Sequence, residues 1–348
     1  HGAASVRRPV DATNDSAPSG CRMTITEEPE KAAEATPAAV PRLPRFGAGA
    51  TGLVSLLLVA GVLVVPLFGL LIAPLGLVPV LHFQSGGTSG VRAWGWVVAV
   101  LAAGSLLGLG GLPLVLLAAY GLIVVVPAVS VELWSRVGWS EGRWAAATVT
   151  CGLAVVLAGM MVVTQPAGPV EAVAEAMRSA AVDAKEMYGA MGFAEGEIEL
   201  AFDASERVIP WVLPSVVITY LIVILFWIRP RIPLLGYGVE VGAFEDYRGE
   251  DWLAAGFALS GLGSLFLGGT PRWVALNLLI SVLVLYFVQG LAMIRAHLAR
   301  WVGRGWFVRW GVALMCIYPP MPVLVAAMGV ADSFFSLRPA KSDDGGNE

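Results

Sequence analysis

The sequence has few charged residues. They make up 14% of its 348 positions, whereas hydrophobic residues make up 57% and the mean hydropathy is +0.75. A soluble globular protein of this composition would have too little polar surface to cover its apolar side chains. The basic residues form no block and do not alternate with aromatic residues, so nucleic acid is not an expected partner. The composition instead predicts a lipid bilayer as the surroundings of most of the chain.

Cysteine and histidine are also scarce, with three of each. Cys21, Cys151 and Cys316 are far apart and two of them lie in apolar segments, so neither a disulfide framework nor a zinc site is expected. His82 and His297 lie at the ends of apolar segments, without the further histidines or carboxylates that a metal site needs. The sequence also lacks a phosphate-binding loop and a dinucleotide fingerprint. We therefore expect neither a metal nor a cofactor.

One enzymatic pattern is present. Gly87-Thr88-Ser89-Gly90 has the G-x-S-G form found around the serine of rhomboid-type intramembrane proteases, and His297 could supply a base. However, four small residues in a polar loop are typical of any turn, and this loop is expected at the water interface rather than within a span. We therefore expect no enzymatic activity, with an intramembrane serine protease as a remote alternative.

Long apolar segments are abundant. About 20 apolar residues cross the roughly 30 Å of hydrocarbon in a bilayer. All twelve tryptophans lie at the ends of such segments or in the loops between them, where the amphipathic indole ring favours the headgroup level. The predicted fold class is an all-α, polytopic membrane protein with about eight or nine transmembrane helices. The candidate spans are 47–64, 67–83, 93–109, 113–133, 144–164, 210–228, 252–268, 273–294 and 310–331.

The arginines predict how these spans are oriented. If 47–83 is a tight hairpin of two spans, twelve arginines fall on one side of the membrane, as the positive-inside rule requires of cytoplasmic loops. A single crossing would place most of them outside. We therefore expect a multi-pass protein of the bacterial cytoplasmic membrane with a cytoplasmic amino terminus. The arginines are Arg42, Arg45, Arg92, Arg136, Arg143, Arg229, Arg231, Arg248, Arg295, Arg300, Arg304 and Arg309.

The composition also divides the chain into three parts. Residues 46–335 form the expected membrane domain, and the segments 1–45 and 336–348 have compositions that predict disordered tails. Residues 1–22 precede the first methionine, Met23, and we do not assume that they are native.

An acidic insertion, 166–208, is expected on the outer side. Its apolar residues recur at helical spacing from Val170 to Met191, which predicts an amphipathic helix broken near Gly192 and Gly196. This helix would cap the outer face of the bundle, and a solvated linker with helical tendency is the alternative. On the inner side, prolines and glycines predict an irregular, rigid start for the loop 229–251.

Polar residues within spans are the candidate ligand-binding residues, because a polar group in hydrocarbon is usually buried against protein or lines a cavity. Asn277 and Ser281 share one helical face, and Tyr286 and Gln289 form a second cluster on the same helix. Hydrogen bonding between helices is the structural alternative. At the end of another span, Glu132 and Arg136 have the i, i+4 spacing of an ion pair. Asp332 and Arg338 at a helix end suggest packing or capping.

Prolines and small residues give two further pointers. Pro74 interrupts the second span, while Pro319, Pro320 and Pro322 interrupt the last, and such breaks either form a binding site or only kink the helix. Small residues also form stripes on the first span, which suit either docking of a membrane partner or packing within the chain. The stripe residues are Gly47, Ala48, Thr51, Gly52 and Ser55.

Two segments carry a resemblance to a known family. Leu285-Tyr286-Phe287-Val288-Gln289-Gly290-Leu291-Ala292, together with the segment from Gly329 to Arg338, resembles the YybS-like family of uncharacterised bacterial membrane proteins (domain of unknown function 2232). The fold of that family is similar to the S components of energy-coupling-factor transporters. The resemblance implies a small-molecule, vitamin-like substrate-binding component, with the stripe on the first span docking an energy-coupling partner. A structural or assembly protein that binds other membrane proteins is the competing class. The ligand and the oligomeric state stay open.

Overall fold

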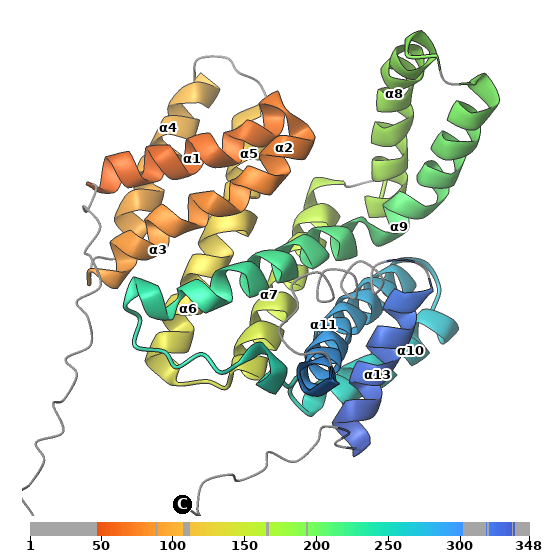
Figure 1. Cartoon of the computed structure of the whole chain (residues 1–348). Coiled ribbons are helices and arrows are strands. Elements are labelled where there is room, and N and C mark those ends of the chain that lie inside the picture. Colours follow the sequence, from red (N-terminus) through yellow and green to blue (C-terminus); the bar gives the residue numbers. More distant parts are fainter. Residues whose placement is uncertain are drawn as a thin grey trace, which may run out of the picture. The chain divides into compact units, whose positions relative to one another are not determined.

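The computed structural model describes residues 47–87, 90–106, 112–164, 167–192, 194–301, 318, 320–335 and 337. Within these residues every regular element is helical (Figure 1). The expected tails lie outside them, apart from Leu337. Five helical segments are long and apolar enough to cross a membrane: Phe68–Ser85, Val115–Val137, Glu141–Val163, Gly196–Arg231 and Gly269–Leu298. The described chain is therefore an all-helical, multi-pass membrane protein with several shorter apolar helices beside these five.

The first 40 described residues form a tight helical hairpin. Helix α1 (Ala48–Val64) is followed by Val65, and α2 (Pro66–Ile72) starts at a proline, whose fixed φ suits the first turn of a helix. The two helices touch at a pair of glycines, because a Cβ atom on Gly69 would lie 2.3 Å from the carbonyl oxygen of Gly61. The segment 47–83 thus consists of two packed helical arms, as the arginine pattern predicts.

The second arm of the hairpin is interrupted where the sequence predicts. Pro74 lies in a short 3₁₀ turn, η1 (Ala73–Gly76), before α3 (Leu77–Ser85) continues in the same direction. Ser55 of α1 donates a hydrogen bond to the Gly76 carbonyl at 2.6 Å, so a side chain of the first arm satisfies a carbonyl at the break. The break is therefore packed against the chain itself.

The next helices are α4 (Val91–Leu106), α5 (Leu112–Tyr120), the π-helical turn η2 (Gly121–Val125), α6 (Val126–Val137) and α7 (Glu141–Val163). Tryptophans form the corner between α6 and α7. The rings of Trp134 and Trp144 stack with centroids 4.5 Å apart, and Trp134 donates to the Trp139 carbonyl at 2.8 Å. Trp144 and Trp273 are completely buried. The interpretation of every flanking tryptophan as an interface anchor is therefore wrong for these residues, which pack inside the protein.

A second helical hairpin contains most of the predicted insertion. Helix α8 (Pro169–Ala190) turns at Gly192, which has a φ of 88°, and packs against the first part of α9 (Glu195–Ile228). The predicted break near Gly192 is confirmed, whereas Gly196 lies inside α9. We expected the insertion to lie over the bundle as a cap, but α8 makes its main contacts with α9 (Figure 1).

An irregular segment, residues 229–251, follows α9, and we call it the strap. It contains the 3₁₀ turns η3 (Arg229–Arg231), η4 (Pro233–Leu235) and η5 (Phe244–Asp246). Its side chains tie together the ends of α3, α7 and α11. Tyr237 donates to the Leu81 carbonyl at 3.0 Å, Arg229 binds Glu141, and Glu245 binds Arg295 at 2.6 Å. We call this end of the bundle the arginine face; it carries Arg136, Arg143, Arg229, Arg248 and Arg295.

The last described helices are α10 (Trp252–Phe266), α11 (Gly269–Trp301) and α13 (Met321–Phe335). Helices α11 and α13 cross in close backbone contact. A Cβ atom on Gly290 would lie 2.0 Å from the Val325 carbonyl oxygen, and one on Gly329 would lie 2.0 Å from that of Tyr286. Within the predicted span 310–331, the described residues form a helix from Met321, directly after Pro320. Residues 310–317 and Pro319 lie outside the described residues.

Candidate functional site

Asn277 of α11 completes the hydrogen bonding of α9 at a proline break. Pro214 has no N–H, so the Pro210 carbonyl lacks its partner four residues on. The indole of Trp273 donates to that carbonyl at 3.1 Å. The Asn277 amide donates to the Trp211 carbonyl at 2.8 Å, and its Oδ1 accepts from the Ser215 backbone N–H at 3.0 Å and the Ser215 hydroxyl at 2.6 Å. We call this contact the Asn277 junction.

Ser281, the other residue of the first predicted cluster, is also engaged. It is completely buried, and its hydroxyl donates to the Asn277 carbonyl one turn earlier at 2.8 Å. The second Asn277 amide hydrogen is bound in the same way, to the Trp273 carbonyl at 2.8 Å. The structure therefore brings Asn277 and Ser281 together: Asn277 makes hydrogen bonds to α9, as in the interhelical alternative, whereas the hydroxyl of Ser281 bonds within α11. Ligand binding by these two residues stays a prediction.

The second predicted cluster joins α11 to α13 and to the strap. Gln289 is completely buried and accepts the backbone N–H of Gly249 at 3.1 Å. Its amide donates to Asp332 at 3.0 Å and to the Ser333 hydroxyl at 3.2 Å. We call this contact the Gln289 junction. Asp332 is thus buried against α11 in a packing role, and the two segments that carry the family resemblance meet here. Tyr286, on the adjacent turn, is buried with its ring edge-on to Phe257 at 6.2 Å.

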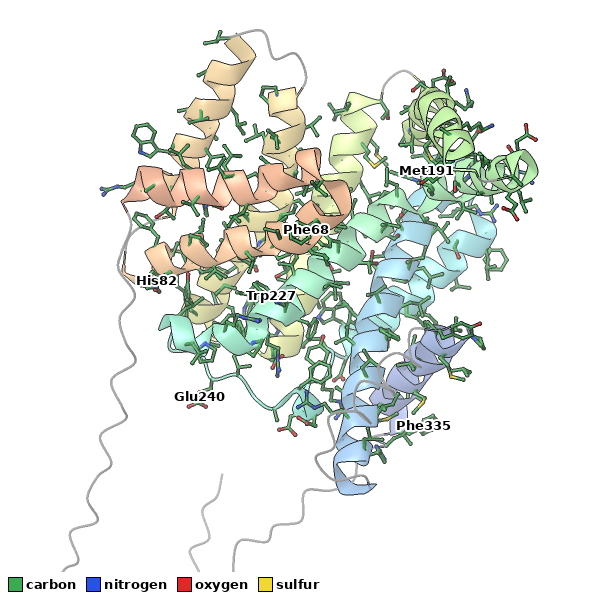
Figure 2. The ribbon with its side chains drawn as sticks, turned by 45° about the horizontal axis from the view of Figure 1, so that its top comes forward. Phe68, His82, Met191, Trp227, Glu240 and Phe335 are labelled. Atoms are coloured by element: carbon green, nitrogen blue, oxygen red, sulfur yellow. The ribbon has the colours of Figure 1, made fainter. Side chains whose placement is uncertain are left out.

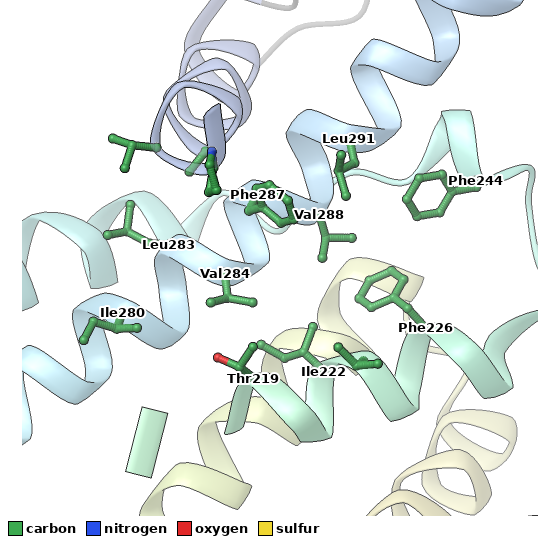
Figure 3. A pocket seen from close by; sticks show the side chains of 14 residues that line it. Thr219, Ile222, Phe226, Phe244, Ile280, Leu283, Val284, Phe287, Val288 and Leu291 are labelled. Carbon is green, nitrogen blue, oxygen red and sulfur yellow. The ribbon is translucent and has the colours of Figure 1, made fainter. Parts of the chain in front are cut away.

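Between the two junctions, α9, α11 and α13 enclose a groove of about 570 Å³ (Figure 3). Its lining is almost wholly apolar. Among the described residues that line it, Thr219 is the single polar one, and its hydroxyl donates to the Ser215 carbonyl at 2.7 Å. Phe226 and Phe244 line the end of the groove toward the strap, with ring centroids 6.2 Å apart. The groove can therefore hold an apolar chain but offers little to a polar ligand.

The strap end of the groove is rich in buried polar contacts. Arg229 is 6% exposed and forms a bidentate ion pair with Glu141, while it also donates to the Gly242 carbonyl at 2.8 Å. Its guanidinium lies 5.9 Å from the Phe244 ring centroid, and that of Arg295 lies 5.7 Å from the same centroid. Phe244 is thus placed between the groove and two cations.

Two tyrosines of the strap are held as neutral phenols. Burial raises the pKa of Tyr247, and the negative charge of Glu141 adds to this shift. Burial likewise raises the pKa of Tyr237, with a smaller contribution from Glu132. The Tyr237 hydroxyl donates to the Leu81 carbonyl at 3.0 Å and lies 3.2 Å from Gln84 Oε1, and these contacts tie the strap to α3.

The small-residue stripe of α1 is largely used inside the chain. Thr51 and Ser55 are buried, and a Cβ atom on Gly52 would lie 2.6 Å from the Ala93 carbonyl oxygen of α4. By contrast, a Cβ atom on Gly47 would meet no neighbour, and Ala48 is partly exposed. The arrangement of Thr51, Gly52 and Ser55 matches packing within the chain. Docking of a partner by the stripe stays a prediction.

The protease pattern stays an untested alternative. Thr88 and Ser89 lie outside the described residues. His297 Nδ1 lies 2.9 Å from the Met293 carbonyl oxygen of its own helix. Among the described residues no group of three histidine, cysteine or acidic side chains could hold a metal ion.

Comparison with protein families identifies the chain. A family model described as "Predicted membrane protein (DUF2232)" matches residues 52–333. The chain belongs to the DUF2232 family. The resemblance to YybS-like proteins is thereby confirmed. No curated protein and no solved structure matches this DUF2232 protein, and the fold similarity to S components stays a prediction.

Several residues of the candidate site were not identified in the sequence. Pro210 and Pro214 break α9 at the Asn277 junction, and a pair of prolines in the longest apolar helix is a signal that could have found them. Gly249 and Phe244 lie in the strap, where only the fold shows that they meet α11. The Glu132–Arg136 ion pair, in contrast, forms as predicted.

Proposed function

We propose that this DUF2232 protein binds an apolar or amphipathic molecule within the membrane, without catalysing a reaction. The groove of about 570 Å³ between α9, α11 and α13 carries this proposal. Its volume lies within the range of about 300–1,000 Å³ that is typical of ligand pockets. The two junctions hold α11 against its neighbours at either end, so the groove is built on helices whose positions are set by buried hydrogen bonds.

The buried polar groups support an apolar ligand over a vitamin-like polar one. Asn277, Ser281 and Gln289 are all engaged with protein groups. A ligand that used them would have to replace these hydrogen bonds, at a net cost of about 0.5–1.5 kcal/mol for each one not remade. An apolar ligand in the groove would leave them intact. The resemblance to S components implies that such binding would serve uptake of the ligand together with an energy-coupling partner.

A structural or assembly role is the second candidate. The hydrogen bonds of Asn277 and Gln289 to neighbouring helices favour it, because a scaffold requires polar side chains that join helix to helix. In that case the groove would hold an apolar helix of another membrane protein instead of a small molecule. The mass of the molecule bound in the groove therefore distinguishes small-molecule binding from a scaffold role.

We also propose the orientation that follows from the arginines. Arg229 lies in the strap, and Arg143 and Arg295 form ion pairs with its residues Glu250 and Glu245, at the arginine face, the end where the strap joins α3, α7 and α11. The positive-inside rule then places this face in the cytoplasm of a bacterial cell, with a cytoplasmic amino terminus and eight or nine crossings of the inner membrane.

A thermal-shift experiment tests the binding role. Purified full-length protein would be heated with a panel of fatty acids, isoprenoids, quinones, vitamins and metal ions. We expect apolar or amphipathic compounds to raise the melting temperature, and Val284→Phe, which fills the groove, to remove the shift. Val216→Phe is the matched control, because Val216 lies on α9, is 55% exposed and does not line the groove.

The same panel contains the results that would overturn the proposal. A shift by polar vitamins that is lost in Asn277→Leu or Gln289→Leu would restore the polar site predicted from the sequence. A complete lack of shifts, with a second protein co-purifying stoichiometrically with the original chain but not with Val284→Phe, would favour the scaffold.

A further inference from the structure

We propose that the groove holds one acyl chain of an anionic phospholipid, whose phosphate binds the guanidinium of Arg295. This inference rests on the proposed binding role and names the ligand class for the same groove. It follows from the position of Arg295, from the length of the groove and from the apolar character of its lining.

Arg295 lies at the mouth of the groove. Leu291 lines the groove, and Arg295 is the residue one helical turn further along α11. Its guanidinium lies 5.7 Å from the ring centroid of Phe244, which lines the same groove. The Arg295 side chain is 54% exposed, so a headgroup in the surrounding membrane can reach it.

The guanidinium of Arg295 has donors beyond those used by its protein partner. Its Nε–H donates to Glu245 at 2.6 Å. The two terminal nitrogens carry four further N–H groups in a planar fork, a geometry that fits two oxygens of a phosphate. Arg229 also lies close to the Phe244 ring, at 5.9 Å from its centroid, but it is buried in its ion pair with Glu141 and is not placed to do the same. Arg295 is therefore the cation that recognises the headgroup.

The groove has the length of one leaflet. Its lining on α11 runs from Ile280 to Leu291, which is about 16 Å at 1.5 Å per residue. Half of a hydrocarbon core of about 30 Å is a similar distance. A chain that starts at an arginine near the headgroup level and runs along the groove would therefore end near the bilayer midplane, as an acyl chain does.

The experiment compares anionic and zwitterionic lipid on the full-length protein. The protein in detergent would be titrated with equal amounts of dioleoyl phosphatidylglycerol and dioleoyl phosphatidylcholine, and bound lipid would be counted by native mass spectrometry. We expect the wild type to retain phosphatidylglycerol preferentially. Arg295→Gln should lower retention of phosphatidylglycerol about fivefold, since one arginine near an anionic surface contributes on the order of this factor. Retention of phosphatidylcholine should fall less, because the cation of its own choline group offsets the charge of its phosphate, so the preference for phosphatidylglycerol should fall.

Three further variants make the result specific. Arg136→Gln removes an arginine that is 73% exposed on the same face but far from the groove, and it should leave the preference unchanged. Glu245→Gln removes the competing carboxylate and should raise retention of phosphatidylglycerol. Val284→Phe should lower retention of both lipids, because it fills the space of the acyl chain.

Three other outcomes would each overturn one part of this proposal. If Val284→Phe abolishes binding of apolar compounds while Arg295→Gln changes nothing, the binding role stands and the headgroup assignment is wrong. If phosphatidylglycerol retention depends on Arg295 but not on Val284, the lipid lies on the surface and the groove is not its site. A dimer mass that is lost in Val284→Phe would show a second copy of the chain in the groove, and the lipid inference would fail.

Discussion

Asn277 on α11 accepts the backbone N–H of Ser215 on α9 at 3.0 Å, at the residue directly after Pro214. The same side chain donates to the Trp211 carbonyl. The Asn277 amide therefore hydrogen-bonds one backbone donor and one backbone acceptor in the turn that Pro214 interrupts. A helix with a proline inside the membrane must find partners for the backbone groups that the proline frees. In this protein those partners come from a helix that is 62 residues away in sequence.

The Asn277 junction predicts a large effect of Asn277→Leu on stability. The substitution removes bonds to Ser215 and Trp211, and buried hydrogen bonds between membrane helices average about 0.6 kcal/mol each. We expect a loss of about 2 kcal/mol in the free energy of unfolding, measured by circular dichroism during titration of mixed micelles with dodecyl sulfate. Ser281→Ala, which removes one bond within α11, should cost less than half as much. Equal losses for the two variants would contradict the bridging role.

The crossing of α11 and α13 predicts that alanine is not tolerated at its glycines. In Gly290→Ala or Gly329→Ala the new methyl group would lie 2.0 Å from a carbonyl oxygen of the other helix. The helices would have to separate, and we expect a loss of about 1–3 kcal/mol, as for other overpacked cores. Gly261→Ala in α10 is the control, because a Cβ atom there would meet nothing within 4 Å. It should be neutral or stabilising by up to about 1 kcal/mol, and a similar loss in all three variants would contradict the prediction.

The ion pair between Arg229 and Glu141 predicts that Arg229→Met is strongly destabilising. The two side chains are 6% and 16% exposed, so removal of the cation leaves a largely buried carboxylate without its partner. We expect a loss of about 3 kcal/mol or more in the free energy of unfolding. Arg136→Gln breaks a pair whose arginine is 73% exposed, and it should cost less than about 1 kcal/mol. An Arg229→Met variant as stable as the wild type would show that the strap is not anchored here.

The positions of the strap and of the α8–α9 hairpin predict opposite accessibility across the membrane. Glu240 lies in the strap and Met191 at the turn of the hairpin (Figure 2), and both are exposed. In a chain without native cysteines, Met191→Cys should react with a membrane-impermeant maleimide in intact cells. Glu240→Cys should react only after permeabilisation. Labelling of Glu240→Cys in intact cells would reverse the orientation deduced from the arginines.

The sequence predicts local features of this fold well. The hairpin in 47–83, the break at Pro74 and the Glu132–Arg136 pair each depend on residues close together in the chain. The polar residues of α11 stood out because buried polarity is costly in lipid. Their partners could not be found in this way, since the contact of Gln289 with Gly249 depends on where the strap folds back.

Two features depend on the packing of distant helices and could not be predicted. Trp144 and Trp273 occupy sequence positions that suit an interface anchor, yet both face the protein interior. An indole at a helix end can lie beside headgroups or pack against another helix, and sequence position alone does not separate the two. The groove is likewise a space left between α9, α11 and α13, so its existence depends on how these helices cross.

The lengths of the helices have a consequence for the membrane itself. Helices α10 and α13 have 15 residues each, or about 22 Å, whereas α9 has 34 residues, or about 51 Å. Where a helix of this length alone faces about 30 Å of hydrocarbon, the lipid next to it must become thinner or headgroups must be drawn inward. The long helix imposes no such demand, because its first part can continue into water with α8. The protein should therefore deform the bilayer unevenly around its perimeter, and it would be enriched where short-chain lipids lower that cost.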